Sequence, residues 1–259
     1  MDCDDVECLT ELLARRHDLL DALTDGPLTK SELETRLDIS RSTIDRAVRS
    51  LEAEEIVTRD AGAVTLTEFG RVALEGFRRF QRGLGGLRDS VSMHQTFDPE
   101  EPIPFEFFRG ADVVDANRRS PHRPIVAFQQ FLEDVDSVQT VVTGLLPDYV
   151  DYYHTQVLEN EMTAEVVVRA PVLDKLLSMY WDSTSEILST GRFEVYETSV
   201  DPPYSIKVGK GEKSEAAIIT YGPQGVTGFM RSDTREAVEW ASELYQTIKD
   251  DATLIAPMD

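Results

Sequence analysis

The order of the periodic segments in the first 66 residues limits most strongly which folds the chain can adopt. Apolar residues recur at helical spacing over residues 5–24, and a Gly-Pro pair then ends the pattern. Residues 29–32 form an S/T-x-x-E capping box that begins a second helix, and Ser40 can cap a third. Residues 56–66 contain two alternating segments around a central turn. Three helices followed by a hairpin predict a winged helix-turn-helix domain over residues 1–66.

The third predicted helix carries side chains suited to DNA. Its inward positions Ile44, Val48 and Leu51 are apolar, whereas residues 40–50 hold three arginines and one aspartate, a local net charge of +2 in a chain of net charge -22. Hydroxyl and guanidinium groups bind base edges and phosphates, so we expect this helix and the hairpin to contact double-stranded DNA. A solvated helix face and a surface for protein contacts are the alternatives. The expected DNA-binding residues are Thr29, Lys30, Ser31, Ser40, Arg41, Ser42, Thr43, Arg46, Arg49 and Arg59.

Residues 67–95 are predicted to form a linker and dimerisation helix with a glycine hinge. Apolar residues recur there with the 3.5-residue period of a coiled-coil seam. Gly83, Gly85 and Gly86 each cost a helix interior about 1 kcal/mol relative to alanine, so we expect the helix to end near Arg82 and then break. The seam serves either a dimer or packing on the chain's own second domain. Its positions are Ala73, Phe77, Phe80, Leu84, Leu87 and Val91.

Residues 96–259 are predicted to form an α/β sensor domain with a mixed sheet. Strand and helix patterns alternate first, and a run of short strands follows before a final helix. The class of the whole chain is therefore α/β. The predicted strands are 112–115, 138–143, 164–168, 193–197, 204–208, 215–221 and 226–230, and the predicted helices are 125–133, 149–159, 172–188 and 234–249.

Two loops of this second domain are candidates for binding an effector. In α/β sheets, ligands bind beyond the carboxyl ends of strands, where loops lead into helices. Thr143, Gly144 and Arg169 have that placement, and their amide, hydroxyl and guanidinium groups suit a small anion such as a sugar phosphate. A simple turn at Gly144 and an ion pair at Arg169 are the alternatives. A second basic cluster, either an anion contact, a docking surface or a solvated loop, contains Arg118, Arg119 and Arg123.

The acidity of the chain points to its solvent. It has 48 acidic and 26 basic residues, and 20 of the basic residues are arginine, which indicates adaptation to high salt. A hydrophobic content of 41% excludes global disorder. No segment has the roughly 18 apolar residues of a membrane span, and the N-terminus is acidic, so we expect a cytoplasmic protein with no membrane partner. Cys3 and Cys8 are either incidental thiols or a redox-sensing pair.

Two stretches resemble a known kind of regulator. The run LTKSELETRLDISRSTIDRAVRSLEAEEIVTRDAGAVTLTEFGRVALE is similar to the winged-helix domain of archaeal transcription regulators. The run PPYSIKVGKGEKSEAAIITYGPQGVTGFMRSDTREAVEWASELYQTIKDDA resembles the sensor domain of the methanogenesis and filament-formation regulator family, which is widespread in salt-loving archaea. The resemblance implies a cytoplasmic DNA-binding regulator with a ligand or partner domain, and it does not name the ligand.

These observations predict a transcriptional regulator, not an enzyme. The sequence lacks the H-E-x-x-H, G-x-S-x-G and G-x-x-x-x-G-K-[ST] motifs, so we expect no catalytic residues, metal or cofactor. The expected partners are promoter DNA, a second copy of the chain and a small-molecule effector that shifts the dimer between geometries. The alternatives are a metabolic enzyme with an ancillary helix-turn-helix, and a ligand-free regulator whose second domain only mediates oligomerisation.

Overall fold

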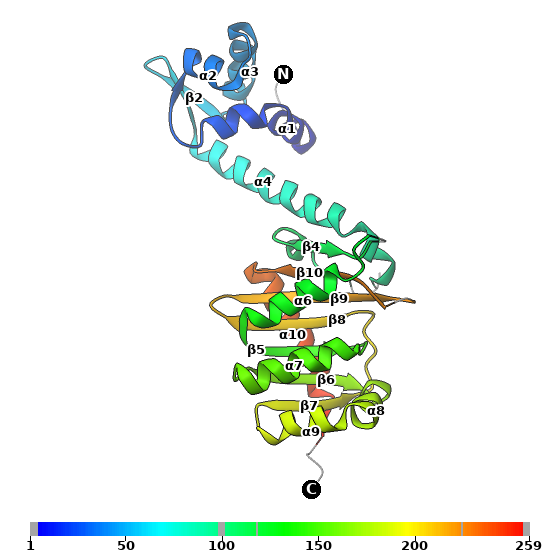
Figure 1. Ribbon diagram of the computed structural model, residues 1–259. Coiled ribbons are helices and arrows are strands. Elements are labelled where there is room, and N and C mark those ends of the chain that lie inside the picture. The colour runs from blue at the N-terminus through cyan, green and yellow to red at the C-terminus, as the bar shows by residue number, and fades with distance from the viewer. Residues whose placement is uncertain (1–4, 98–101, 118, 224, 256–259) are drawn as a thin grey trace. The chain divides into compact units, whose positions relative to one another are not determined.

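The chain folds into two compact units, residues 1–81 and 82–259 (Figure 1). The computed structural model describes residues 5–97, 102–117, 119–223 and 225–255. The boundary between the units falls inside a single helix, and each unit has its own apolar core. Cys3 and Arg118 lie outside the described residues.

The first unit has the predicted winged helix-turn-helix order. In its described part, a three-stranded antiparallel sheet has the order β1-β3-β2. Ala61 and Gly62 connect β2 to β3 with φ angles of 48° and 88°, and positive φ at both central residues is typical of a type I′ hairpin turn. The predicted fold class is therefore confirmed for this unit. Its elements are α1 (Val6–Ala22), β1 (Leu28–Thr29), α2 (Lys30–Leu37), α3 (Arg41–Ala53), β2 (Val57–Asp60), β3 (Ala63–Leu66) and the first part of α4 (Glu68–Asp89).

The predicted break after Arg82 is wrong, because α4 continues through all three glycines to Asp89. A Cβ atom on Gly86 would lie 2.1 Å from the carbonyl oxygen of Phe108. One on Gly83 would lie 2.2 Å from the ring of Phe105. These glycines therefore let the short helix α5 (Phe105–Phe108) approach the α4 backbone. A 3₁₀ helix, η1 (Val91–Thr96), follows α4.

The second unit is built on a mixed sheet, as predicted. Among the described residues, eight strands have the order β11-β7-β6-β5-β8-β9-β10-β4. The central strands β5, β6 and β7 are parallel, and the remaining pairs are antiparallel. The elements are β4 (Asp112–Asp115), α6 (Arg123–Glu133), β5 (Val135–Val142), α7 (Pro147–Glu159), β6 (Thr163–Arg169), α8 (Ala170–Met179), α9 (Trp181–Ser189), β7 (Phe193–Thr198), β8 (Ser205–Gly211), β9 (Ser214–Gly222), β10 (Gly225–Ser232), α10 (Arg235–Asp250) and β11 (Thr253–Leu254).

Helices cover both faces of this sheet (Figure 1). The core on one face contains residues from α6, α7, α8 and α9, and the core on the other contains residues from η1, α5 and α10. Both faces of the central strands are therefore buried, which explains the nearly continuous apolar run in β6.

The helix predicted over residues 172–188 is two helices. The chain leaves helical geometry at Tyr180, where φ is -131° and ψ is 27°, and α9 then begins at Trp181. Apolar residues continue at helical spacing across this point, so periodicity alone predicts one helix.

Candidate functional site

Helix α3 presents three arginines on the surface opposite its buried face. Ser40 caps the helix, since its hydroxyl accepts a hydrogen bond from the Thr43 amide at 3.3 Å. Arg41, Arg46 and Arg49 are exposed, and no described residue forms an ion pair with any of them. The buried residues that fix this orientation are Ile44, Ala47, Val48 and Leu51.

The hydroxyl side chains that were predicted to contact DNA fall into two groups. Thr29 belongs to the capping box of α2: its amide donates to the Glu32 carboxylate at 2.7 Å, and its hydroxyl accepts from the Glu32 amide at 3.3 Å. These hydrogen bonds hold the pKa of Glu32 below its usual value. Thr29 and Ser40 therefore form the helix starts. Ser31, Ser42 and Thr43 are exposed, and the hydroxyls of Ser42 and Thr43 lie 3.1 and 2.9 Å from the Ser40 hydroxyl.

The two other predicted basic contacts are ion-paired. Lys30 of α2 pairs with Asp45 of α3, and its hydrogen bond holds the pKa of the Asp45 carboxyl below its usual value. Arg59 of the hairpin pairs with Glu52 at 2.9 Å. These pairs connect α3 to its neighbours, so the unpaired charge of the predicted DNA surface lies on α3.

Two arginines of α4 have partners within the first unit. Arg78 donates to Asp21 of α1 at 2.9 Å, and Arg79 pairs with Glu75 at 3.0 Å. These charges therefore stabilise α4 and its contact with α1.

The effector residues predicted at the ends of β5 and β6 have partners within the chain. Arg169 pairs with Asp201 at 2.5 Å and borders a hollow that also includes Glu197 and Asp251. Three carboxylates around one guanidinium give this hollow a negative balance, which disfavours an anion. Arg169 therefore forms an ion pair, which was the alternative to anion binding.

The loop after β5 turns its polar groups toward the sheet. The Thr143 amide donates to the Ser205 hydroxyl at 3.0 Å, and the Tyr221 hydroxyl donates to the Gly144 carbonyl at 3.2 Å. Burial raises the pKa of Tyr221 to about 12, so its hydroxyl remains a donor at neutral pH. Thr143 and Gly144 therefore hold the loop to β8 and β9.

The second basic cluster lies elsewhere in this unit. Arg119 and Arg123 border a separate hollow with His122 and Val126, at the start of α6. Arg118 is outside the described residues, so its place in this cluster stays a prediction.

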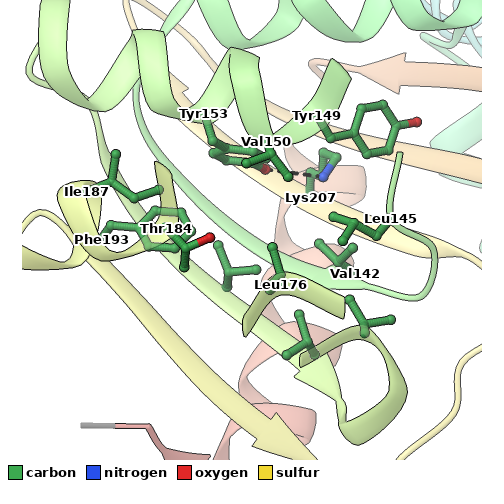
Figure 2. Close-up of a pocket in the computed structure, with 13 residues that line it drawn as sticks. Val142, Leu145, Tyr149, Val150, Tyr153, Leu176, Thr184, Ile187, Phe193 and Lys207 are labelled. Atoms are coloured by element: carbon green, nitrogen blue, oxygen red, sulfur yellow. Dashed lines mark hydrogen bonds between the residues drawn. The ribbon is translucent and has the colours of Figure 1, made fainter. Parts of the chain in front are cut away.

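A cavity that sequence reasoning missed lies between the sheet and helices α7, α8 and α9 (Figure 2). Its volume is about 30 Å³. Its wall is almost entirely hydrocarbon, although four of the lining residues, Tyr149, Tyr153, Thr184 and Lys207, carry polar groups. The lining residues are Val142, Leu145, Tyr149, Val150, Tyr153, Val166, Val168, Val172, Leu176, Thr184, Ile187, Phe193 and Lys207.

Lys207 is the most unusual group in this cavity. Its side chain comes from β8, is 1% exposed, and donates to the Thr140 hydroxyl at 3.0 Å and the Tyr153 hydroxyl at 3.3 Å. Its Nζ atom also lies 4.9 Å from the centre of the Phe128 ring. No carboxylate among the described residues pairs with it, and burial lowers its pKa to about 7. A lysine in an alternating strand pattern usually indicates a solvated face, so the sequence does not reveal that Lys207 is buried.

Within the described ranges, no helix is long and apolar enough to cross a membrane. No group of three or more His, Cys, Asp or Glu side chains in those ranges is arranged to hold a metal ion.

Solved structures similar to the chain differ widely in function. TrmBL2, described as an archaeal chromatin protein with a novel mode of DNA binding, is 14% identical, with a TM-score of 0.44 over 97% of this chain and 100% of that chain. Nuc from Salmonella typhimurium, a phospholipase D family member, is 8% identical, with a TM-score of 0.45 over 56% and 97%. NucT from Helicobacter pylori is 10% identical, with a TM-score of 0.42 over 56% and 98%. At such TM-scores these likenesses carry no argument about function.

Family models match both units. No curated protein matches the chain significantly. The model of the HVO_A0261 N-terminal domain matches residues 3–85, and that of the middle domain of the methanogenesis regulatory protein FilR1 matches residues 121–251. The second match spans 131 of 259 residues, just over half of the chain, and confirms the family that the sequence resembles. The protein therefore belongs to the FilR1 family of regulatory proteins.

Proposed function

We propose that this regulatory protein is a sequence-specific, DNA-binding transcriptional regulator that reads the major groove with α3. The observation that carries the proposal is the set of three exposed arginines, Arg41, Arg46 and Arg49, which have no ion pair within the described residues. Their helix is fixed by a capped start and a buried apolar face. A guanidinium group can bind the O6 and N7 atoms of guanine together, and it binds phosphates equally well. Ser42 and Thr43 add exposed hydroxyls at the start of the same helix, and Ser31 adds one on α2.

A homodimer is the second part of the proposal. Helix α4 exposes Phe69, Val72, Phe80 and Leu84, and steps of three, eight and four residues place them along one stripe of the helix. Phe77, which was expected in the seam, is only 9% exposed and belongs to the core of the first unit. A second copy of α4 would cover the stripe and bring two α3 helices to two half-sites of an operator.

The third part is control by a small molecule bound in the second unit. A ligand that binds one dimer geometry more tightly shifts the population toward that geometry. A tenfold change in operator affinity requires about 1.4 kcal/mol of such coupling. We further place the regulator in a cytoplasm of high salt, because its net charge of -22 and its arginine-rich basic residues suit that solvent.

The DNA proposal is tested by footprinting. Genome-wide cross-linking first identifies the sites that the protein occupies in cells. Arg46→Ala should then lose specific protection of such a site by about tenfold to 100-fold, because a good bidentate base contact contributes about 1–3 kcal/mol. Arg15→Ala is the matched control, since Arg15 is equally exposed but pairs with Glu11 on α1. Equal protection by both variants would refute the assignment of α3 as the reading helix.

A further inference from the structure

Polar groups without adequate partners meet in the cavity beside β8. The Lys207 ammonium has three N–H donors, and the described residues offer it two hydroxyl oxygens. The Thr184 hydroxyl is 2% exposed and has no hydrogen-bond partner. Figure 2 shows both groups among the apolar side chains that line the same space. Two independent observations, an unpaired cation and an unpartnered hydroxyl, therefore point into one cavity.

Such an arrangement is costly in an empty cavity. A buried polar group without a partner costs about 1–3 kcal/mol, and a charged one costs more. Buried groups of this kind require an explanation, such as a bound molecule. The structure offers no internal carboxylate as an alternative partner within the described residues, and the phenols of Tyr149 and Tyr153 have pKa values that burial raises further above neutrality. A further hydrogen-bond partner for Lys207 would therefore have to come from outside the chain.

The lining determines the chemistry of that partner. An ammonium with two neutral hydroxyl acceptors favours a single negative charge with lone pairs, as a carboxylate provides. Sugars and phosphates need many polar partners, whereas this wall is mainly valine, leucine, isoleucine and phenylalanine. A metal cation would be repelled by Lys207. The volume of about 30 Å³ corresponds to roughly two to three water-sized spheres, so the ligand is small.

We propose that the cavity is a binding site for a one- or two-carbon monocarboxylate, formate or acetate. Its carboxylate accepts hydrogen bonds from Lys207, and the methyl group of acetate lies among Val142, Val166 and Val168. This inference rests on the proposed sensing function and names its ligand class and site. Leu145, on the loop between β5 and α7, also lines the cavity, so the ligand contacts a segment outside the sheet.

The test is isothermal titration calorimetry of the full chain without DNA. Formate and acetate serve as probes, and acetamide serves as the neutral analogue of acetate. We expect both acids to bind and the amide to bind at least tenfold more weakly. The carboxylate favours the charged lysine, whose pKa in the free protein is about 7, so binding at pH 8.5 should take up nearly one proton per ligand and binding at pH 6 almost none. Titrations in buffers of different ionisation enthalpy measure this uptake.

Three variants assign the site. Lys207→Met keeps the volume and removes the charge, and it should abolish both carboxylate binding and the proton uptake. Thr184→Val keeps the shape of the side chain and removes the unpartnered hydroxyl, so it should change affinity less than tenfold. Lys210→Met is the matched control, because Lys210 is exposed on the same strand and its loss should leave binding unchanged.

Several outcomes would overturn the proposal. They are equal affinity for acetate and acetamide, binding without proton uptake at pH 8.5, or unchanged binding by a folded Lys207→Met variant. A gain of more than tenfold on replacing KCl with K₂SO₄ at equal ionic strength would identify chloride as the occupant instead. If Lys207→Met fails to fold, the comparison of acid with amide and the proton uptake of the unaltered protein still test the proposal. None of these results depends on DNA, so they are independent of the footprinting test of α3.

Discussion

The two units place their key cations in opposite environments. On α3, Arg41, Arg46 and Arg49 stand in solvent without ion pairs among the described residues. On β8, Lys207 is buried in hydrocarbon, also without a carboxylate. A guanidinium in water costs the fold almost nothing, whereas an ammonium in an apolar cavity costs several kcal/mol. The exposed charges are therefore available to a large anionic partner, and the buried charge suits a small one that can enter the core.

The largest effect should come from removing the buried charge. The unfolded chain holds the Lys207 proton up to its ordinary pKa of 10.5, whereas the folded chain releases it near 7. Between these values the folded state binds fewer protons, so stability rises with pH. Below pH 7 the full cost is present, about 5 kcal/mol at 1.36 kcal/mol per pKa unit. Lys207→Met should therefore raise the free energy of unfolding by about 3–5 kcal/mol at pH 6, since it also loses two hydrogen bonds.

Denaturant titrations of both proteins from pH 6 to pH 9 check this. The advantage of Lys207→Met should shrink by about 1.4 kcal/mol per pH unit above pH 7. Lys210→Met, at an exposed position near the end of the same strand, should show no such trend. A stability difference that is constant with pH would mean that Lys207 is not strongly desolvated.

The next effect concerns the exposed arginines and separates binding from stability. Arg46→Ala should lower specific DNA affinity by about 1–3 kcal/mol, because base contacts of arginine have that size. Its free energy of unfolding should change by less than about 0.5 kcal/mol, because the side chain is exposed and unpaired. Thermal unfolding and gel-shift titrations measure the two quantities. A variant that lost as much stability as affinity would contradict the contrast between the exposed arginines of α3 and the buried lysine of β8.

A smaller effect is expected from salt. About six phosphate contacts imply that log affinity falls with log [KCl] with a slope near -5. At about 1 M salt the Debye length is about 3 Å, so attraction between α3 and a duplex acts only on contact. We expect base contacts to maintain specific binding, with a slope less than half of that value between 0.5 and 2 M KCl. Fluorescence anisotropy with a labelled operator measures the slope, and the full value would show that phosphate contacts dominate.

The smallest effect should come from the paired cation Lys30. It is about a quarter exposed and pairs with Asp45, so Lys30→Met should cost at most about 1 kcal/mol of stability. The loss should decrease as KCl rises, because salt screens exposed pairs. Chemical unfolding at 0.5 and 3 M KCl measures it. A loss that grew with salt would be inconsistent with an ion pair.

The two regions also differ in how far the sequence predicts them. The start and faces of α3 depend on Ser40 and on apolar residues three or four positions apart, so local patterns are sufficient. Lys207 depends on Phe128 and Tyr153, which are more than 50 residues away, and an alternating strand does not reveal that helices cover its polar face. The partner of Arg169 was missed for the same reason, since Asp201 is distant in sequence.

The continuous course of α4 was also hidden from local reasoning. Helix propensity correctly assigns a cost to Gly83 and Gly86, but it does not include the backbone and ring that approach them in the folded unit. Propensity therefore predicted a break where close packing maintains a helix.

The most direct test of the account is the ratio of specific to non-specific DNA affinity for the double variant Arg41→Ala, Arg46→Ala. It is measured by competition between a mapped operator and a shuffled duplex of the same composition. The unaltered protein should prefer the operator by about 10³-fold or more, as specific DNA-binding proteins do. If α3 reads the bases, the ratio for the variant should fall toward one while its unfolding transition stays the same. An unchanged ratio would contradict the account, because the exposed arginines would then have no part in recognition.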